Sequence, residues 1–266
     1  YSSELKQSTE GSVNGNSSGD TLVVENSSDF NFGSGDFTVE LFAYHAGTSG
    51  NDTLVGMWNS GANRRTWMID IEADQGRLRG FWSTDGSNNS VVQTATKYIA
   101  RYRWNHVVFC RQGNTMRLYL NGNQEATATE SSSLYNNTTD GLGILSATET
   151  GSDPCKGHIS NVRIVKGTCL YPDGTSFTPP SAPLTNVTNT KLLCCQSKTS
   201  ANAVSVGPGT FINDGTNYSS NNQVTGSTGL VDVDAIFNGH LRTSGIPTMN
   251  EGATVSLSSD NYILWT

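Results

Sequence analysis

The sequence predicts an all-β fold: a two-sheet antiparallel jelly-roll sandwich followed by a small, truncated β unit. Composition is the first observation, because Gly makes up 28 of 266 residues, only 15% are charged, and Ser, Thr and Asn fill the gaps between apolar runs. Such a chain offers few positions for a long amphipathic helix. The second observation is a series of short segments in which apolar and polar residues alternate, which is the period of a half-buried strand. The third is turn-forming sequence between them, such as Asn121-Gly122, whose residues tolerate positive φ.

Short alternating segments follow one another through most of the chain, with turn residues between them. The polar turn 112–114 joins two of them into a hairpin pattern. In the segment that begins at residue 158, apolar and polar residues interleave with one irregularity, which indicates a β-bulge. The expected strands are 21–25, 37–45, 53–58, 66–72, 77–83, 91–96, 106–111, 116–120, 124–129, 141–146, 158–166 and 191–196.

Four prolines set residues 172–190 apart from the strands around them. Proline removes a donor from a sheet ladder, so we expect this segment to wrap the outside of the sandwich. After residue 196 the sequence becomes rich in Ser, Asn and Gly, and from residue 230 the two-residue period resumes. We therefore expect an N-terminal arm or linker over 1–20, a jelly-roll domain over 21–196, an irregular connector over 197–229 and the start of a second small β domain over 230–266.

The charge balance excludes some classes of partner. The net charge is -7 with a pI of about 5.0, and the 16 basic residues are scattered. The densest basic stretches alternate along strands, so binding of nucleic acid is not expected; they contain Arg77, Arg79, Arg101, Arg103 and Arg111. No apolar run approaches the ~18 residues that span a bilayer, so membrane insertion is not expected either. The chain begins without Met or a signal pattern, and we expect a longer protein around it.

The five cysteines cannot all pair within the chain. We expect them to be free and buried as small apolar side chains, as in a protein that matures in a reducing cell. The adjacent Cys194 and Cys195 should point to opposite faces of a strand. A bridge between Cys155 and Cys169 is the alternative, because the intervening segment could fold back on itself.

Four blocks, in order, resemble the laminin-G-like, concanavalin-A-type lectin jelly rolls. They are residues 35–40 (GDFTVE), 104–109 (WNHVVF), 119–122 (YLNG) and 157–164 (GHISNVRI). The resemblance implies a lectin-type sandwich. It leaves the function open, because this fold is used by lectins, adhesion modules, sugar hydrolases and inert spacers.

A second resemblance covers the continuation of the chain. Residues 165–171 (VKGTCLY), 177–180 (FTPP), 183–185 (PLT) and 192–196 (LLCCQ) are similar to virion proteins of marine and cyanobacterial phages. This implies a non-enzymatic module of a bacteriophage tail fibre or capsid-surface fibre, assembled in the host cytoplasm into the virion. Its partners would be other virion subunits, in a homo-oligomer, and a host-surface glycan. The alternative is a secreted, extracellular bacterial lectin or adhesin domain.

Residues 68–72 (MIDIE) test the enzyme hypothesis, because they resemble the E-x-D-x-E strand of the glucanases of the same superfold. That resemblance implies a nucleophile where this chain has Met68, whose thioether cannot form a glycosyl intermediate. Asp70 and Glu72 remain, and a retaining hydrolase needs two carboxylates about 5–5.5 Å apart. Glycan hydrolysis is therefore the least favoured function, and we expect no enzyme.

No cofactor is expected, with calcium as the alternative. The laminin-G resemblance implies an ion at the sandwich rim, and Asp70 is the candidate ligand on a strand whose acidic face is otherwise simply solvated. Asp52, Asp85 and Asp140 also lie in or beside predicted loops, but no spaced calcium motif accompanies them. Each of these three is expected to be a turn former.

A sugar site needs an aromatic face and nearby amides. Trp82, with Asp85 and Asn88, is the first candidate set, and Trp58 and Tyr135 lie similarly at strand ends beside polar loops. For each tryptophan the competing interpretation is a place in the sandwich core, because one large aromatic ring buries 150–250 Å².

Overall fold

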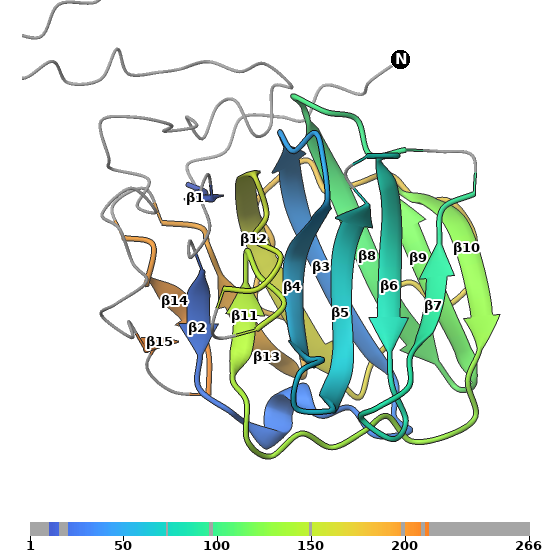
Figure 1. Ribbon diagram of the computed structural model, residues 1–266. Coiled ribbons are helices and arrows are strands. Elements are labelled where there is room, and N and C mark those ends of the chain that lie inside the picture. The colour runs from blue at the N-terminus through green and yellow to red at the C-terminus, as the bar shows by residue number, and fades with distance from the viewer. Residues whose placement is uncertain are drawn as a thin grey trace, which may run out of the picture.

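The computed structural model describes residues 11–15, 21–72, 74–95, 98–148, 151–197, 200–208 and 211–212. Two antiparallel sheets pack face to face (Figure 1), so the predicted all-β sandwich is confirmed. The expected second β unit over 230–266 lies outside the described residues, as does most of the expected arm over 1–20. In the described part of the chain, no helix has the length and apolar character that crossing a membrane requires.

The first sheet has the strand order β10-β9-β8-β3-β12-β13-β14, and β1 pairs with the beginning of β12. Central strands β3, β8 and β12 are buried along almost their whole length, as expected for strands covered on both faces. The bounds are β1 Val13–Gly15, β3 Phe37–His45, β8 Trp104–Gln112, β9 Thr115–Leu120, β10 Asn123–Thr129, β12 Gly157–Lys166, β13 Thr190–Cys194 and β14 Val204–Val206.

The second sheet has the order β15-β2-β11-β4-β5-β6-β7. A short 3-10 helix, η1 (Ser28–Phe30), lies between β2 and β3 in the chain and is capped by the Ser27 hydroxyl. The bounds of the strands are β2 Leu22–Val24, β4 Asn51–Asn59, β5 Arg64–Glu72, β6 Arg77–Trp82, β7 Ser90–Gln93, β11 Leu142–Ile144 and β15 Phe211–Ile212.

All twelve strands expected from the sequence are present, most of them within two residues of the expected ends. The expected irregularity in β12 is also present: the register with β3 shifts between Ser160 and Arg163, and Asn161 has a φ of 54°. Three short strands lie outside the twelve expected segments, although the connector was expected to allow short strands. β1 falls within 1–20, and β14 and β15 fall within the expected connector 197–229, so pairing extends beyond residues 21–196 on both sides.

The core fills the space between the sheets with large apolar side chains. Trp67 and Trp82 of the second sheet face Phe109 of the first, and the rings of Trp82 and Phe109 lie 6.3 Å apart. A side chain at Gly80 would meet the Phe109 ring at 2.7 Å, so only glycine allows this approach of the sheets. Aromatic burial of this kind supplies much of the stability of a sandwich.

The proline-rich segment 168–189 covers the outer face of the first sheet, as expected from its prolines. We call it the wrap. Tyr171 and Phe177 of the wrap pack on Val108, Cys110 and Tyr119. Leu184, further along, packs in a second cluster with three aromatic residues of the same face, Phe42, Tyr44 and Trp104. Because the wrap covers it, little of this sheet face remains available to a ligand.

A buried ionic cluster fixes the wrap to the sheet. The Glu40 carboxylate on β3 accepts two hydrogen bonds from Arg163 at 2.8 and 2.6 Å through Oε1. Its Oε2 accepts from His106 at 3.1 Å and from the hydroxyl of Tyr171 at 2.8 Å. Glu40 is fully buried, so the cluster satisfies a carboxylate that would otherwise be costly to remove from water.

All five cysteines are free, as expected. Cys155 lies in the core between the sheets, whereas Cys169 packs on the outer face of the first sheet, so the alternative Cys155–Cys169 bridge was wrong. The expected opposite orientation of Cys194 and Cys195 was also wrong. β13 ends at Cys194, and Cys195 turns into the same core cluster with a φ of 61°, which brings the two sulfurs to 3.4 Å.

Candidate functional site

The loops of the sandwich gather at two opposite ends. The loops after β4, β6 and β10 lie at the end drawn lowest in Figure 1, and the loops after β3, β5 and β7 lie at the upper end. The sequence-predicted residues Asp85, Asn88 and Tyr135 come together at the lower end. Loops held by a rigid sandwich are where binding residues concentrate, so both ends are candidate surfaces.

At the lower end, Asp85 and Asn88 form a closed turn. Asp85 accepts hydrogen bonds from the backbone N–H groups of Ser87 at 2.8 Å and Asn88 at 2.7 Å, and from the Asn88 amide at 2.7 Å. The hydrogen bonds from Asn88, ahead of that from Ser87, lower the pKa of Asp85 to about 2. The polar atoms of Asp85 and Asn88 are therefore used within the turn that they stabilise.

Trp82 is not a stacking surface, which corrects the leading sequence prediction. Its side chain is only 2% exposed and faces the core, and its indole nitrogen donates to Glu130 at 2.9 Å. Trp58 lies on the outer face of the second sheet, where it packs with Met68, Ala147 and Phe81 and is 8% exposed. Both tryptophans are therefore buried packing residues and offer no exposed ring to a sugar.

Tyr135 is half-buried against the turn that contains Asp85. Its N–H donates to the carbonyl of Ser83 at 2.8 Å, and a side chain at Gly86 would lie 3.1 Å from its ring. The structure thus brings three of the five predicted sugar-binding residues together. The ring of Tyr135, however, packs against that turn.

Asp70 is held by an arginine, against the expectation of a calcium ligand. Both oxygens accept hydrogen bonds from Arg79, at 2.8 and 2.5 Å, and the aspartate is 1% exposed. Calcium would have to displace that guanidinium. Among the described residues, no group of three His, Cys, Asp or Glu side chains could hold a metal ion.

The same arrangement removes Asp70 from acid catalysis. Burial raises its pKa to about 6, against the opposing hydrogen bonds of Arg79. A raised pKa is what a general acid needs, but both oxygens already accept from the guanidinium. Met68, on the same outward face of β5, supplies no nucleophile.

Asp140 and Asp52, the other two aspartates named from the sequence, also have charged or polar partners. Asp140 accepts from Arg64 at 2.7 and 2.5 Å and from Asn137 at 2.9 Å, and these hydrogen bonds, those of Arg64 first, lower its pKa. Asp52 lies fully buried, with one oxygen 2.7 Å from the His45 ring nitrogen. Asp140 therefore fixes its loop, whereas Asp52 lies inside strand β4, so the turn-forming role expected of it was wrong.

At the upper end, the side chains of two tyrosines are exposed to solvent. Tyr98 is 54% exposed and Tyr102 is 61% exposed, which makes them the exposed aromatic side chains of the described chain. Arg101 and Arg103 lie in the same loop. We call residues 98–103 the tyrosine loop. No site was expected here from the sequence, because Arg101 and Arg103 belong to the scattered basic residues; the one available signal was the run Arg101-Tyr102-Arg103 directly before β8.

A buried asparagine fixes the backbone of the tyrosine loop. The amide of Asn105 donates to the carbonyls of Ala100 at 2.8 Å and Arg103 at 2.9 Å. Its oxygen accepts from the amide of Asn121 at 3.1 Å and from the N–H of Ala100 at 3.4 Å. Asn105 is fully buried, so the loop is anchored to β8 rather than to solvent.

Tyr102 is held in a backbone conformation that bulky residues rarely adopt. Its φ is 58°, and its N–H donates to the carbonyl of His45 at 2.9 Å. Such a conformation costs on the order of 1 kcal/mol and persists only where neighbouring contacts impose it. Ile99 is buried beneath the loop and donates to the carbonyl of Gly76 at 2.9 Å. The hydrogen bond to His45 and the packing of Ile99 hold the loop in the conformation in which the Tyr102 side chain is exposed.

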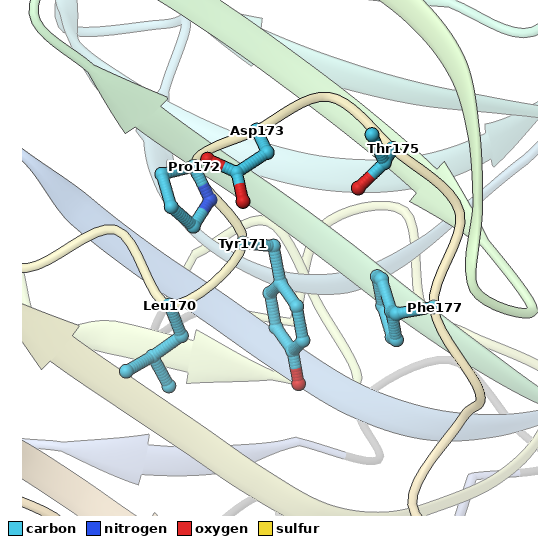
Figure 2. Close-up of a pocket in the computed structure, with 6 residues that line it drawn as sticks. All are labelled: Leu170, Tyr171, Pro172, Asp173, Thr175 and Phe177. Carbon is cyan, nitrogen blue, oxygen red and sulfur yellow. The ribbon is translucent and has the colours of Figure 1, made fainter.

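A small pocket lies on the wrap, away from both loop ends. Its volume is about 140 Å³, below the ~300 Å³ of most small-molecule sites. Figure 2 shows the Tyr171 and Phe177 rings facing each other within it, and their centroids are 4.1 Å apart. Because the Tyr171 hydroxyl donates a hydrogen bond to Glu40, these rings help to attach the wrap to the sheet. The pocket is lined by Leu170, Tyr171, Pro172, Asp173, Thr175 and Phe177.

Two antiparallel sheets with loop-borne aromatic and polar groups define a β-sandwich of the lectin type. Residues 16–170 match a laminin-G family profile described as the concanavalin A-like lectin/glucanases superfamily. This match covers more than half of the chain, and the protein belongs to that family. A comparison with curated proteins gives no match.

Solved structures are similar in fold. A proposed carbohydrate-binding protein from Bacteroides ovatus has a TM-score of 0.53 and 17% identity, over 78% of this chain and 57% of that protein. Domains LG4-5 of the mouse laminin alpha1 chain give a TM-score of 0.46 and 14% identity, over 75% and 47% of the two chains. A heptameric pentraxin from Limulus polyphemus gives 0.44 and 13%, over 62% and 79%. At these identities the similarity concerns the fold alone.

Proposed function

We propose that this protein is a non-enzymatic carbohydrate-binding domain that presents the tyrosine loop to its ligand. The observation that carries the proposal is the pair of exposed rings, Tyr98 and Tyr102, on a backbone fixed by the buried Asn105. Tyrosine provides a flat apolar face with a polar tip at a low cost in conformational entropy. A preorganised loop loses little further freedom when it binds, which favours affinity.

The loop also suggests a ligand class. Arg101 and Arg103 flank Tyr102, and a guanidinium pairs well with carboxylate or sulfate groups. An anionic polysaccharide would contact the rings through its sugar faces and the exposed Arg103 through its acidic groups. The proposed ligand is therefore a surface glycan that carries acidic groups.

The absence of catalysis is part of the proposal. Met68 occupies the position where the glucanases of this superfold have their nucleophile, and Arg79 occupies both oxygens of Asp70. A retaining mechanism needs two available carboxylates that flank the bond. The family membership accommodates binding without hydrolysis.

For the biological setting, we propose a module of a bacteriophage tail fibre or capsid-surface fibre, which assembles with other virion subunits and adheres to the host surface. The resemblance of residues 165–196 to phage virion proteins supports it, and so do five free cysteines, which suit assembly in a reducing cytoplasm. The alternative is a secreted bacterial lectin or adhesin. The fold similarity to the proposed carbohydrate-binding protein of Bacteroides ovatus is consistent with that alternative.

A glycan array with algal and cyanobacterial polysaccharides tests the binding proposal. We expect saturable binding to acidic glycans and no release of reducing sugar. Tyr98→Ala and Tyr102→Ala should each weaken binding about tenfold, whereas Asn88→Ala at the opposite end should leave it unchanged. Release of sugar would contradict the non-enzymatic assignment, and loss of binding only in the Asn88 variant would place the site at the lower end.

Labelling of purified particles separates the two settings. An antibody against the domain should decorate phage fibres in electron micrographs if the virion proposal holds. Recovery of the protein from particle-free culture medium, with a signal peptide on its precursor, would favour the secreted lectin instead.

A further inference from the structure

Two thiols lie together beneath the wrap, outside the core between the sheets. Cys110 on β8 is fully buried, and Cys169 at the start of the wrap is half-buried. Both pack in the cluster that contains Val108 and Tyr119. Each thiol also shifts the pKa of the other. This contact joins two segments that are far apart in the sequence.

The hydroxyl of one threonine fixes Cys169 over Cys110. Thr38 on β3 is the register partner of Cys110 in the adjacent strand. Its hydroxyl donates to the carbonyl of Thr168 at 3.1 Å and accepts from the N–H of Leu170 at 2.9 Å. The residues on both sides of Cys169 are thus tied to the strand beside Cys110. The backbone therefore places both thiols in one cluster on this face of the sheet.

We propose that Cys110 and Cys169 form a disulfide when the protein meets an oxidising environment, and that this bond staples the wrap to the sandwich. The bond would close a loop of about 60 residues, and closing a loop of that size restricts the unfolded chain strongly. The wrap carries Tyr171, whose hydroxyl donates to the buried Glu40, so the staple would also protect that ionic cluster from solvent.

The oxidant is a small-molecule disulfide of the glutathione class. The Cys169 thiolate attacks one sulfur of the small disulfide, forms a mixed disulfide and releases one small thiolate. Cys110 then loses its proton to solvent and attacks the Cys169 sulfur, which forms the protein disulfide and releases the second thiolate. The protein loses two electrons and two protons, and the small disulfide is reduced to two thiols.

The order of these steps follows from exposure and acidity. Cys169 is half-buried, and the interaction with the Cys110 thiol lowers its pKa although burial opposes this. The interaction with the Cys169 thiol, ahead of burial, raises the pKa of Cys110. Cys169 is therefore the attacking thiol, and closure by Cys110 is the slow step.

The other cysteines are poorer candidates. The sulfurs of Cys194 and Cys195 lie 3.4 Å apart, but neighbouring Cα atoms across a trans peptide are about 3.8 Å apart, below the usual ~4.4–6.8 Å of a disulfide. The described residues contain no cis peptide bond. Cys155 lies in the core, in a different cluster from Cys169. Selective oxidation of one pair is therefore expected.

The test is incubation of the whole protein in a glutathione redox buffer, followed by thiol counting after denaturation and by peptide mapping without reductant. We expect five titratable thiols to become three, a mixed disulfide on Cys169 to appear first, and a peptide linking residues 110 and 169 to follow. The midpoint of thermal unfolding should rise by roughly 10 °C on oxidation.

Two variants make the result decisive. Cys169→Ser should keep its thiols and lose the thermal shift, whereas Cys155→Ala, the control, should still form the linked peptide even if its starting stability is lower. Persistence of all five thiols in the oxidised wild type would overturn the proposal, as would a linked peptide that joins any other pair.

Discussion

Replacement of Glu40 should destabilise the protein more than most single changes, because it removes one carboxylate from three partners at once. In a Glu40→Ala variant, Arg163 loses hydrogen bonds of 2.8 and 2.6 Å and keeps the carbonyl of Thr185 at 2.8 Å. The Arg163 side chain is 8% exposed, so water cannot replace the carboxylate freely. Breaking a buried pair from one side costs about 3–5 kcal/mol. For a domain of this size, that lowers the midpoint of thermal unfolding by roughly 10 °C.

The assay is urea unfolding followed by tryptophan fluorescence, with two companion variants. Glu40→Gln keeps an acceptor and should lose roughly half as much stability. The double variant Glu40→Met/Arg163→Met removes both charges, so it should recover most of the loss, because an apolar pair of similar volume tolerates burial. A Glu40→Ala loss below about 1 kcal/mol would refute the reasoning, as would a double variant less stable than either single one.

The pH dependence of the stability is a second test of the role of Glu40. Burial raises the pKa of Glu40, but the hydrogen bond from His106 and the charge of Arg163 outweigh it, so the net change is downward. A group whose pKa is lower in the folded state contributes its stability above the unfolded pKa and loses it as the pH falls through the folded pKa. We expect the stability of wild type to fall more steeply than that of Glu40→Gln below about pH 4.5.

The remaining predictions concern a turn, a histidine and a loop aspartate. Gly122→Ala should cost about 2–4 kcal/mol in urea unfolding, because φ is +80° and the new Cβ would overlap the carbonyl of Phe177; Gly113→Ala, with open space around it, should cost about 1 kcal/mol. Burial lowers the pKa of His158 to about 4, so stability should fall by roughly 3 kcal/mol from pH 6.5 to 4, and His158→Leu should remove that slope. Asp140→Ala should lower the thermal midpoint by about 5 °C, more than the exposed Asp85→Ala.

The strands were predictable because apolar and polar residues alternate with a period of two along a strand that is buried on one face. β3, β8 and β12 also matched blocks of a known jelly roll, so their order in the fold followed. The wrap was predictable for a different reason, since proline cannot join a ladder. The three short strands β1, β14 and β15 carry two or three residues each, too few for a period to be recognised.

The site was less predictable, because it depends on the sheet face to which each side chain points and on the pairing register between neighbouring strands. Leu78 and Trp82 share one face of β6, opposite Arg79, so alternation already indicated that Trp82 points inward. The pairing of Asp70 with Arg79 joins two strands, and a single strand does not reveal its register. The tyrosine loop was hidden because its exposure depends on Asn105, whose contacts to the loop form only in the folded chain.

The most direct test of the carbohydrate-binding account is a calorimetric titration of the acidic glycan that binds best on the array. Wild type should bind it with one site per chain, and the Tyr98→Ala/Tyr102→Ala double variant should bind at least a hundredfold more weakly at unchanged thermal stability. Wild-type affinity in the double variant would contradict the assignment of the tyrosine loop. If no tested glycan binds the wild type, the protein is a structural module and the proposed function is wrong.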